Sequence, residues 1–189
     1  RIGVNSPGAA IAGGDNGGWY MHSLAVGSGY TGTLDLEHGA DALVDGPAII
    51  GHGTSEQNYL ATLTLDGAGT SSPTALYVSE TLTVGHNLRG LLDITNGAQV
   101  IAYHDVSLGA IEHVNPQPQP DGEISVRGEN LIDHQPSEMF IAGDLKLGLD
   151  LFNARSHVTI YDGAQVNVSG TMTMSVEPGS PSQLLIQGV

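Results

Sequence analysis

The stretch SLAVGSGYTGTLDLEHGA, residues 23–40, decides the fold because it recurs. Fifty-eight positions further on, residues 81–98 read TLTVGHNLRGLLDITNGA, and eight of the eighteen positions are identical. The identical pairs are Leu24/Leu82, Val26/Val84, Gly27/Gly85, Gly32/Gly90, Leu34/Leu92, Asp35/Asp93, Gly39/Gly97 and Ala40/Ala98. Self-similarity at a fixed offset is the signature of a repeat architecture. Residues that correspond in the two copies are therefore expected to occupy equivalent sites.

A second kind of unit alternates with the first, and its changes in length fall in loops. Residues 49–51, IIG, and the pair Leu63/Leu65 return as residues 108–109, LG, and the pair Ile124/Val126. A looser third copy of the first unit consists of Leu145, Leu147, Gly148, Val158, Ile160, Gly163 and Ala164. Met172, Met174, Leu184 and Ile186 belong to the last units. The register of apolar residues is thus kept over long offsets, as stacked strands require.

The pattern inside each unit predicts short strands that are buried on one side. Leu34 and Leu36 flank Asp35, and this alternation with a period of two is typical of a half-buried strand. A β-sandwich or jelly roll also uses short alternating strands, but it does not require apolar residues to return in register. We therefore expect an all-β fold, a right-handed parallel β-helix (β-solenoid) of glycine-rich repeats. The glycines are expected at sharp turns or at positions of positive φ.

The whole chain, residues 1–189, is expected to be a single solenoid segment. Residues 1–22 read as an irregular lead-in or a partial repeat, with a loop at residues 12–19, and residues 23–189 as repeats. The sequence opens on Arg1 without a Met and closes within the pattern, which suggests a segment of a longer protein.

Charge and composition exclude several classes of partner. The chain has 5 Lys plus Arg against 20 Asp plus Glu, a formal net charge of −15, which argues against nucleic-acid and anionic-membrane binding. Such charge keeps an elongated surface soluble, and weak calcium binding by outward carboxylates is the alternative use. Cysteine is absent, so disulfides and cysteine-based zinc sites are excluded. No apolar run is long enough to span a bilayer.

The eight histidines invite a metal hypothesis, but a metal site needs several ligands that converge on one point. They are His22, His38, His52, His86, His104, His113, His134 and His157. His38 aligns with Asn96 and Asp162, each directly before a glycine, which indicates a polar turn position instead of a ligand set. We therefore predict no metal and no cofactor site.

Two further sets of charged residues follow the repeat. Asp35 and Asp93 take the outward position of equivalent strands, and Tyr161 is predicted to take that place in the third copy. Outward strand positions are normally polar, so solvated side chains are the expectation. Arg89 and Arg155 each precede an apolar strand residue by three positions, which predicts stacking along one edge or an edge ion pair.

The residues VG…GxLxIxxGA (84–98) and LG…GxIxVxG (108–128), with the turn DGAGT (66–70), resemble a known repeat. It is the repeat shared by autotransporter (type V secretion) passenger domains and PEP-CTERM-associated bacterial surface proteins. The resemblance covers most of the chain from about Leu24 onward. It implies a right-handed β-helix at the outer surface of, or secreted by, a Gram-negative bacterium, often adhesive or self-associating.

The sequence therefore predicts a non-enzymatic extracellular surface protein: an adhesin, stalk or self-associating module. Its partner would be a surface glycan or protein, or a second copy, bound by repeated weak contacts through Tyr30, Tyr59 and the proline-rich loop at residues 115–121. The alternatives are a structural filament subunit and a polysaccharide lyase or hydrolase. The enzyme is disfavoured because no catalytic motif is recognisable and the aromatic residues are scattered: Trp19, Tyr20, Tyr30, Tyr59, Tyr77, Tyr103 and Tyr161. We predict no catalytic residues.

Overall fold

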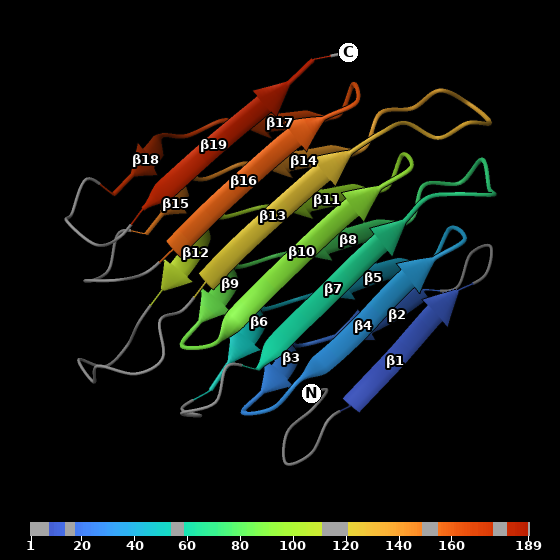
Figure 1. The fold of residues 1–189 in the computed structure, drawn as a ribbon. Coiled ribbons are helices and arrows are strands. Elements are labelled where there is room, and N and C mark those ends of the chain that lie inside the picture. The colour runs from blue at the N-terminus through green and yellow to red at the C-terminus, as the bar shows by residue number, and fades with distance from the viewer. Residues whose placement is uncertain are drawn as a thin grey trace.

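The described part of the chain is all-β. The computed structural model describes residues 8–13, 18–53, 59–110, 121–148, 155–175 and 181–188. These residues form nineteen strands and no helix. The strands are arranged in three sheets, one of seven strands and two of six, and every pairing between them is parallel. Figure 1 shows the seven-stranded sheet in front and the other two behind it.

We call the seven-stranded sheet the first sheet. Its strands, in spatial order, are β1 (Gly8–Gly13), β4 (Gly32–Glu37), β7 (Leu60–Asp66), β10 (Arg89–Thr95), β13 (Asp121–Arg127), β16 (Arg155–Tyr161) and β19 (Ser182–Gln187).

The second and third sheets have six shorter strands each. The second sheet contains β2 (Gly18–Met21), β5 (Asp41–Val44), β8 (Ala75–Val78), β11 (Gln99–Ala102), β14 (Glu138–Ile141) and β17 (Gln165–Val168). The third sheet contains β3 (Leu24–Ser28), β6 (Ala48–His52), β9 (Leu82–His86), β12 (Val106–Ala110), β15 (Leu145–Leu147) and β18 (Met172–Met174).

The chain visits the three sheets in turn, so each coil adds one strand to each sheet. In the first sheet Leu34 pairs with Leu63 and Leu63 pairs with Leu92. In the third sheet Leu24 and Leu82 both pair with Ala48. The prediction that residues fifty-eight positions apart are equivalent is therefore confirmed, and the pairing places them two coils apart. The arrangement is that of a β-solenoid, and antiparallel sheets packed face to face are excluded for the described strands.

The core lies between the three sheets and consists of the inward residues of every strand. Leu34 and Leu36 are fully buried, whereas Asp35 between them is only partly buried. The largest fully buried side chains are those of Leu34, Leu36, Ile50, Leu63, Leu65, Leu76, Leu82, Leu88, Leu92, Ile94, Leu108 and Ile124. Each such side chain contributes about 1.5–3 kcal/mol relative to an exposed one. Stacked columns of these residues hold consecutive coils together.

The turn from the first to the second sheet explains the predicted polar position before a glycine. His38, Asn96 and Asp162 have φ of 54°, 54° and 55°, and the glycine after each also has positive φ. In the first of these turns the amide of Ala40 donates to the carbonyl of Glu37 over 3.2 Å, which closes the turn. Short polar side chains tolerate this left-handed conformation better than apolar ones. The polar turn position is confirmed, and no metal is needed to account for it.

Glycine is required where coils approach each other closely. Gly85, at the end of β9, has φ of 78°, and a Cβ there would lie 2.7 Å from the carbonyl oxygen of Asp121 in β13. Both the backbone conformation and the space therefore exclude a side chain. The predicted role of glycine at strand ends holds at this position.

One sequence prediction about organisation needs correction, and one sheet was not predicted at all. Residues 12–19 are not all loop, because β1 extends to Gly13 and β2 begins at Gly18, while residues 14–17 lie outside the described residues. The sequence pattern also gave no sign of the second sheet, although its strands complete every coil but the last. The described residues include no helix long and apolar enough to cross a membrane.

Candidate binding groove on the second sheet

The outward face of the second sheet carries an unusual column of side chains, all but one of them aliphatic or aromatic. The strands are in register, so one outward residue of each strand stacks on that of the next. This column consists of Tyr20, Leu43, Tyr77, Ile101, Phe140 and Asn167, and we call it the aromatic column. Tyr20 is 70% exposed and Leu43 is 38% exposed. Outward positions of half-buried strands are normally polar, whereas apolar groups line this surface.

The same column explains why the second sheet was missed. The inward residues of β8, Leu76 and Val78, flank Tyr77, so both faces of the strand carry large apolar or aromatic groups. The outward residue of such a four-residue strand is also apolar or aromatic. Polar and apolar residues therefore do not alternate with a period of two, and the sequence does not reveal the strand. The signal that could have found it is the recurrence of an aliphatic or aromatic residue between two inward residues in five consecutive strands.

An open groove lies over the first coils of this face. It encloses about 520 Å³ and is lined by Gly18, Trp19, Tyr20, Asp41, Leu43, Tyr77 and Tyr103. Trp19 belongs to the inward row but is 37% exposed, because β2 is the edge strand of the second sheet. Three of the seven aromatic residues considered scattered, Tyr20, Tyr77 and Tyr103, thus share one outward face, and Trp19 borders the groove at its edge strand. The prediction that they are scattered is wrong for these residues, because the coils stack residues that are far apart in the sequence.

Carboxylates flank the groove and perturb the tyrosines. The hydroxyl of Tyr20 donates to Oδ2 of Asp45 over 3.0 Å, and this hydrogen bond raises the pKa of Tyr20. Burial raises the pKa of Tyr77, and the nearby Asp41 and Tyr103 raise it further. Partial burial also raises the pKa of Asp41 itself. The groove therefore combines aromatic surface with hydrogen-bond acceptors and is unfavourable for added negative charge.

Cations are absent from the described part of this face. Of the five Lys and Arg residues, Arg1 lies outside the described residues. The other four lie on strands of the first and third sheets: Arg89, Arg127, Lys146 and Arg155. Nothing in the described groove could neutralise an acidic ligand.

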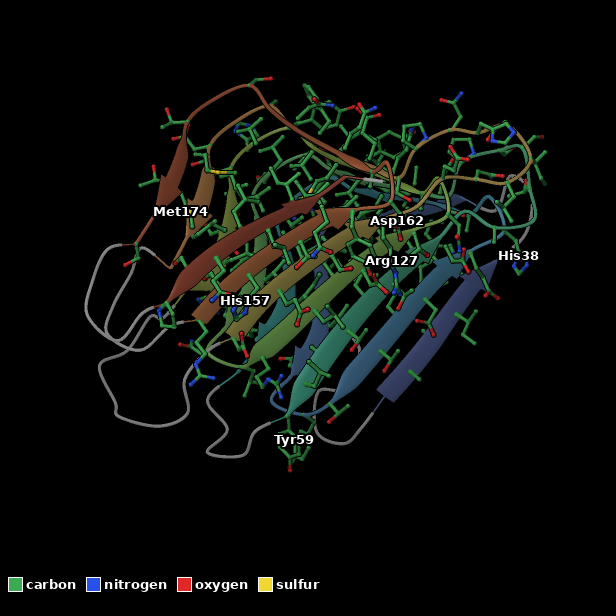
Figure 2. The ribbon with its side chains drawn as sticks, turned by 45° about the horizontal axis from the view of Figure 1, so that its top comes forward. His38, Tyr59, Arg127, His157, Asp162 and Met174 are labelled. Carbon is green, nitrogen blue, oxygen red and sulfur yellow. The ribbon has the colours of Figure 1, made fainter. Side chains whose placement is uncertain are left out.

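On the outward face of the first sheet, charged side chains pair with one another, although Oδ1 of Asp93 and Oδ1 of Asp121 are buried without a hydrogen-bond partner among the described residues. Arg127 donates to Oδ2 of Asp93 over 2.7 Å and to the hydroxyl of Tyr161 over 3.2 Å. Figure 2 shows Arg127 and His157 over the strands of this sheet. The predicted edge ion pair is confirmed for Arg89, whose guanidinium lies 3.6 Å from Asp121. Arg89 and Arg155 do not stack directly, because Asp121 stands between them in the register.

The predicted acidic column is interrupted. Thr64 lies between Asp35 and Asp93 in the register, so the two carboxylates are two coils apart. Thr159, and not Tyr161, takes the equivalent place further along the sheet, so that assignment is wrong. Tyr161 instead continues the row of Arg127, which is why the two side chains meet. Solvated or ion-paired side chains account for this face.

The histidines do not assemble into a metal site within the described residues, where no group of three or more potential ligands occurs. His52 and His86 form one pair, with Nδ1 atoms 2.9 Å apart and rings stacked at an interplanar angle of 9°. His134 contacts Glu129 at 3.0 Å, His157 lies 3.9 Å from Asp121, and His38 lies 3.6 Å from Glu37. His113 lies outside the described residues.

The residues predicted to form a binding face lie elsewhere. Tyr30 and Tyr59 contact each other with ring centroids 5.3 Å apart. Tyr59 lies at the start of β7, at the opposite end of the first sheet from His38 (Figure 2). Residues 115–120 of the proline-rich loop lie outside the described residues, and Asp121 begins β13. The aromatic groove is therefore the best-defined candidate site.

No match was found among models of known protein families, curated protein sequences or solved structures.

Proposed function

We propose that this chain is a non-enzymatic, glycan-binding adhesin of the bacterial outer surface, built as a right-handed β-helix like an autotransporter passenger. The observation that carries the proposal is the aromatic groove of Trp19, Tyr20, Tyr77 and Tyr103 beside Asp41. Ligand sites combine apolar surface with a few convergent polar groups. Aromatic rings stack on the apolar faces of sugar rings, and carboxylates accept hydrogen bonds from sugar hydroxyls. Repeated display of such grooves on a cell surface would add avidity to weak individual contacts.

A panel of soluble neutral and acidic oligosaccharides, measured by calorimetry, tests the proposal. At least one neutral oligosaccharide should bind, and Tyr77→Ala should weaken it about tenfold or more, since buried aromatic anchors dominate binding. Tyr161→Ala is the matched control, because it removes the same side chain from the first sheet. Binding should be unchanged in that variant. Absence of binding to every member, or equal effects of the two variants, would overturn the proposal.

The carboxylate in the groove suggests an alternative function, that of an enzyme. Burial raises the pKa of Asp41, as a general acid requires. Glycoside hydrolases, however, generally use a pair of carboxylates. Among the described residues that line the groove, Asp41 is the single carboxylate. Asp45 adjoins the groove four positions further along the same extended segment, roughly 13 Å away, which is wider than the carboxylate pairs of glycoside hydrolases. Chromatography of the glycan after incubation decides the matter: shortened products that disappear in Asp41→Asn would replace the adhesin with a hydrolase.

A filament subunit is favoured by a different observation. At the end of the stack formed by β17, β18 and β19, inward apolar residues are exposed, with Ile186 at 67% and Met172 at 37%. An uncovered solenoid end can pair with another strand edge. Sedimentation velocity tests this function: concentration-dependent polymers that Ile186→Asp abolishes would support it, and a monomer at all concentrations would exclude it.

A further inference from the structure

We infer that the groove takes an extended, β-linked glycan without acidic groups, and that this glycan lies lengthwise along the stack of coils. The inference rests on the proposed function and adds to it the class of glycan and the direction in which it binds. It follows from the spacing of the aromatic column, the placement of the carboxylates beside it and the charge of the face.

The spacing of the column matches a chain of sugar rings. Tyr20, Leu43 and Tyr77 are consecutive members of the column. Neighbouring strands lie about 4.8 Å apart, so Tyr20 and Tyr77 are separated by roughly 9.6 Å along the stack. Two rings of an extended β-linked glycan cover a comparable distance, and every second ring then presents the same face. The sugar over Leu43 would lie between two that stack on tyrosines.

Hydrogen-bond acceptors lie on both sides of the column. Asp41 and Leu43 are outward residues of β5, and Asp45 continues the same row directly after the strand. A glycan that follows the column would therefore direct its equatorial hydroxyls toward Asp41 on one side and Asp45 on the other. A glycan that crosses the column would meet the same strand at both carboxylates and only one ring of the column.

The charge of the face excludes acidic sugars. Asp41 lines the groove, Asp45 adjoins it, and no Lys or Arg lies on the described strands of the second sheet. A uronate or sulfate would approach these carboxylates without a compensating cation, and like charges at such distances repel. The aromatic column then continues beyond the groove through Ile101, which gives a longer ligand further contacts.

The experiment uses calorimetry of the intact chain with cellobiose, cellotetraose and cellohexaose as neutral β-linked probes. Maltohexaose supplies a curved α-linked control, and hexagalacturonate an acidic one. Cellohexaose should bind roughly tenfold more tightly than cellobiose, because it covers more of the column. Ile101→Ala should weaken cellohexaose about threefold and leave cellobiose unchanged, because only the longer ligand extends along the column beyond Tyr77. Leu185→Ala, which truncates an exposed aliphatic side chain on the outward face of the first sheet, is the matched control and should change neither affinity.

Each outcome decides a separate part of the inference. Equal affinity for the three lengths, or equal effects of Ile101→Ala and Leu185→Ala, would overturn lengthwise binding. Hexagalacturonate or maltohexaose binding as tightly as cellohexaose would overturn the assignment of glycan class. Binding of another neutral glycan without binding of these probes would also overturn the β-linked class but leave the proposed function standing. Failure of every glycan to bind would remove the proposed function itself.

Discussion

The outward faces of the first and second sheets are built by the same coils but differ in what they offer to solvent. On the first sheet, charged side chains pair with one another across coils, as Arg127 does with Asp93 and Arg89 with Asp121. On the second sheet, Tyr20 and Leu43 are exposed apolar groups, and no cation lies on its described strands. The second face gains more from being covered, because binding removes its exposed apolar surface from water. The difference teaches that a binding face can be recognised by the apolar surface that its side chains leave exposed.

The comparison depends on the assignment of inward and outward residues, and the largest expected effect tests that assignment. Leu92 is fully buried, whereas its neighbour Asp93 points outward to Arg127. Leu92→Asp should destabilise the fold by at least about 4 kcal/mol, because it places a carboxylate in the apolar core. Asp93→Leu should change stability by no more than about 1 kcal/mol, since it removes one partly exposed surface ion pair and also a buried carboxylate oxygen that has no hydrogen-bond partner in the described part of the chain.

Urea unfolding followed by circular dichroism measures both variants. The unfolding midpoint should fall sharply, or folding should be lost, for the first substitution only. Similar losses of stability in the two variants would show that the inward and outward faces are wrongly assigned, and with them the groove.

The strands of the first and third sheets could be predicted from the sequence, whereas the groove could not. Leu34, Asp35 and Leu36 alternate clearly, so the strand, its inward side and its equivalent fifty-eight positions away follow from the pattern. In the second sheet, Leu76, Tyr77 and Val78 show no such contrast, so the pattern conceals both the strand and the site that it carries. A site assembled from four separate coils also depends on loop lengths, which decide how far apart in the sequence stacked residues lie.

A smaller expected effect is the pH dependence of stability, which should differ between Asp105 and Asp41. The amide of Asp144 and the ammonium of Lys146 donate to Asp105, and together they lower the pKa of Asp105. Asp41 in the groove has its pKa raised by burial. A lowered pKa stabilises the fold above the unfolded-state pKa, and this stabilisation is lost as the pH falls through the folded-state pKa. A raised pKa has the opposite sign, so stability decreases as the pH rises from the unfolded-state pKa through the folded-state pKa.

The free energy of unfolding, measured from about pH 2.5 to pH 7 around the ordinary carboxyl pKa, should show both signs. Relative to the unmodified chain, Asp105→Asn should lose stability at neutral pH and little at the acidic end. Asp41→Asn should gain a small amount at neutral pH, because it removes a partly buried charge. If the stability of both variants changed with pH in the same way, the proposed difference between the hydrogen-bonded Asp105 and the partly buried Asp41 would be contradicted.

The most direct test of the central claim uses the fluorescence of Trp19, which is the only tryptophan in the chain and lines the groove. A neutral β-linked oligosaccharide that binds by calorimetry should shift the Trp19 emission to shorter wavelength, with the same saturation curve as the heat. A saturating binding isotherm with no change in the Trp19 emission would place the ligand elsewhere and contradict the groove as the binding site.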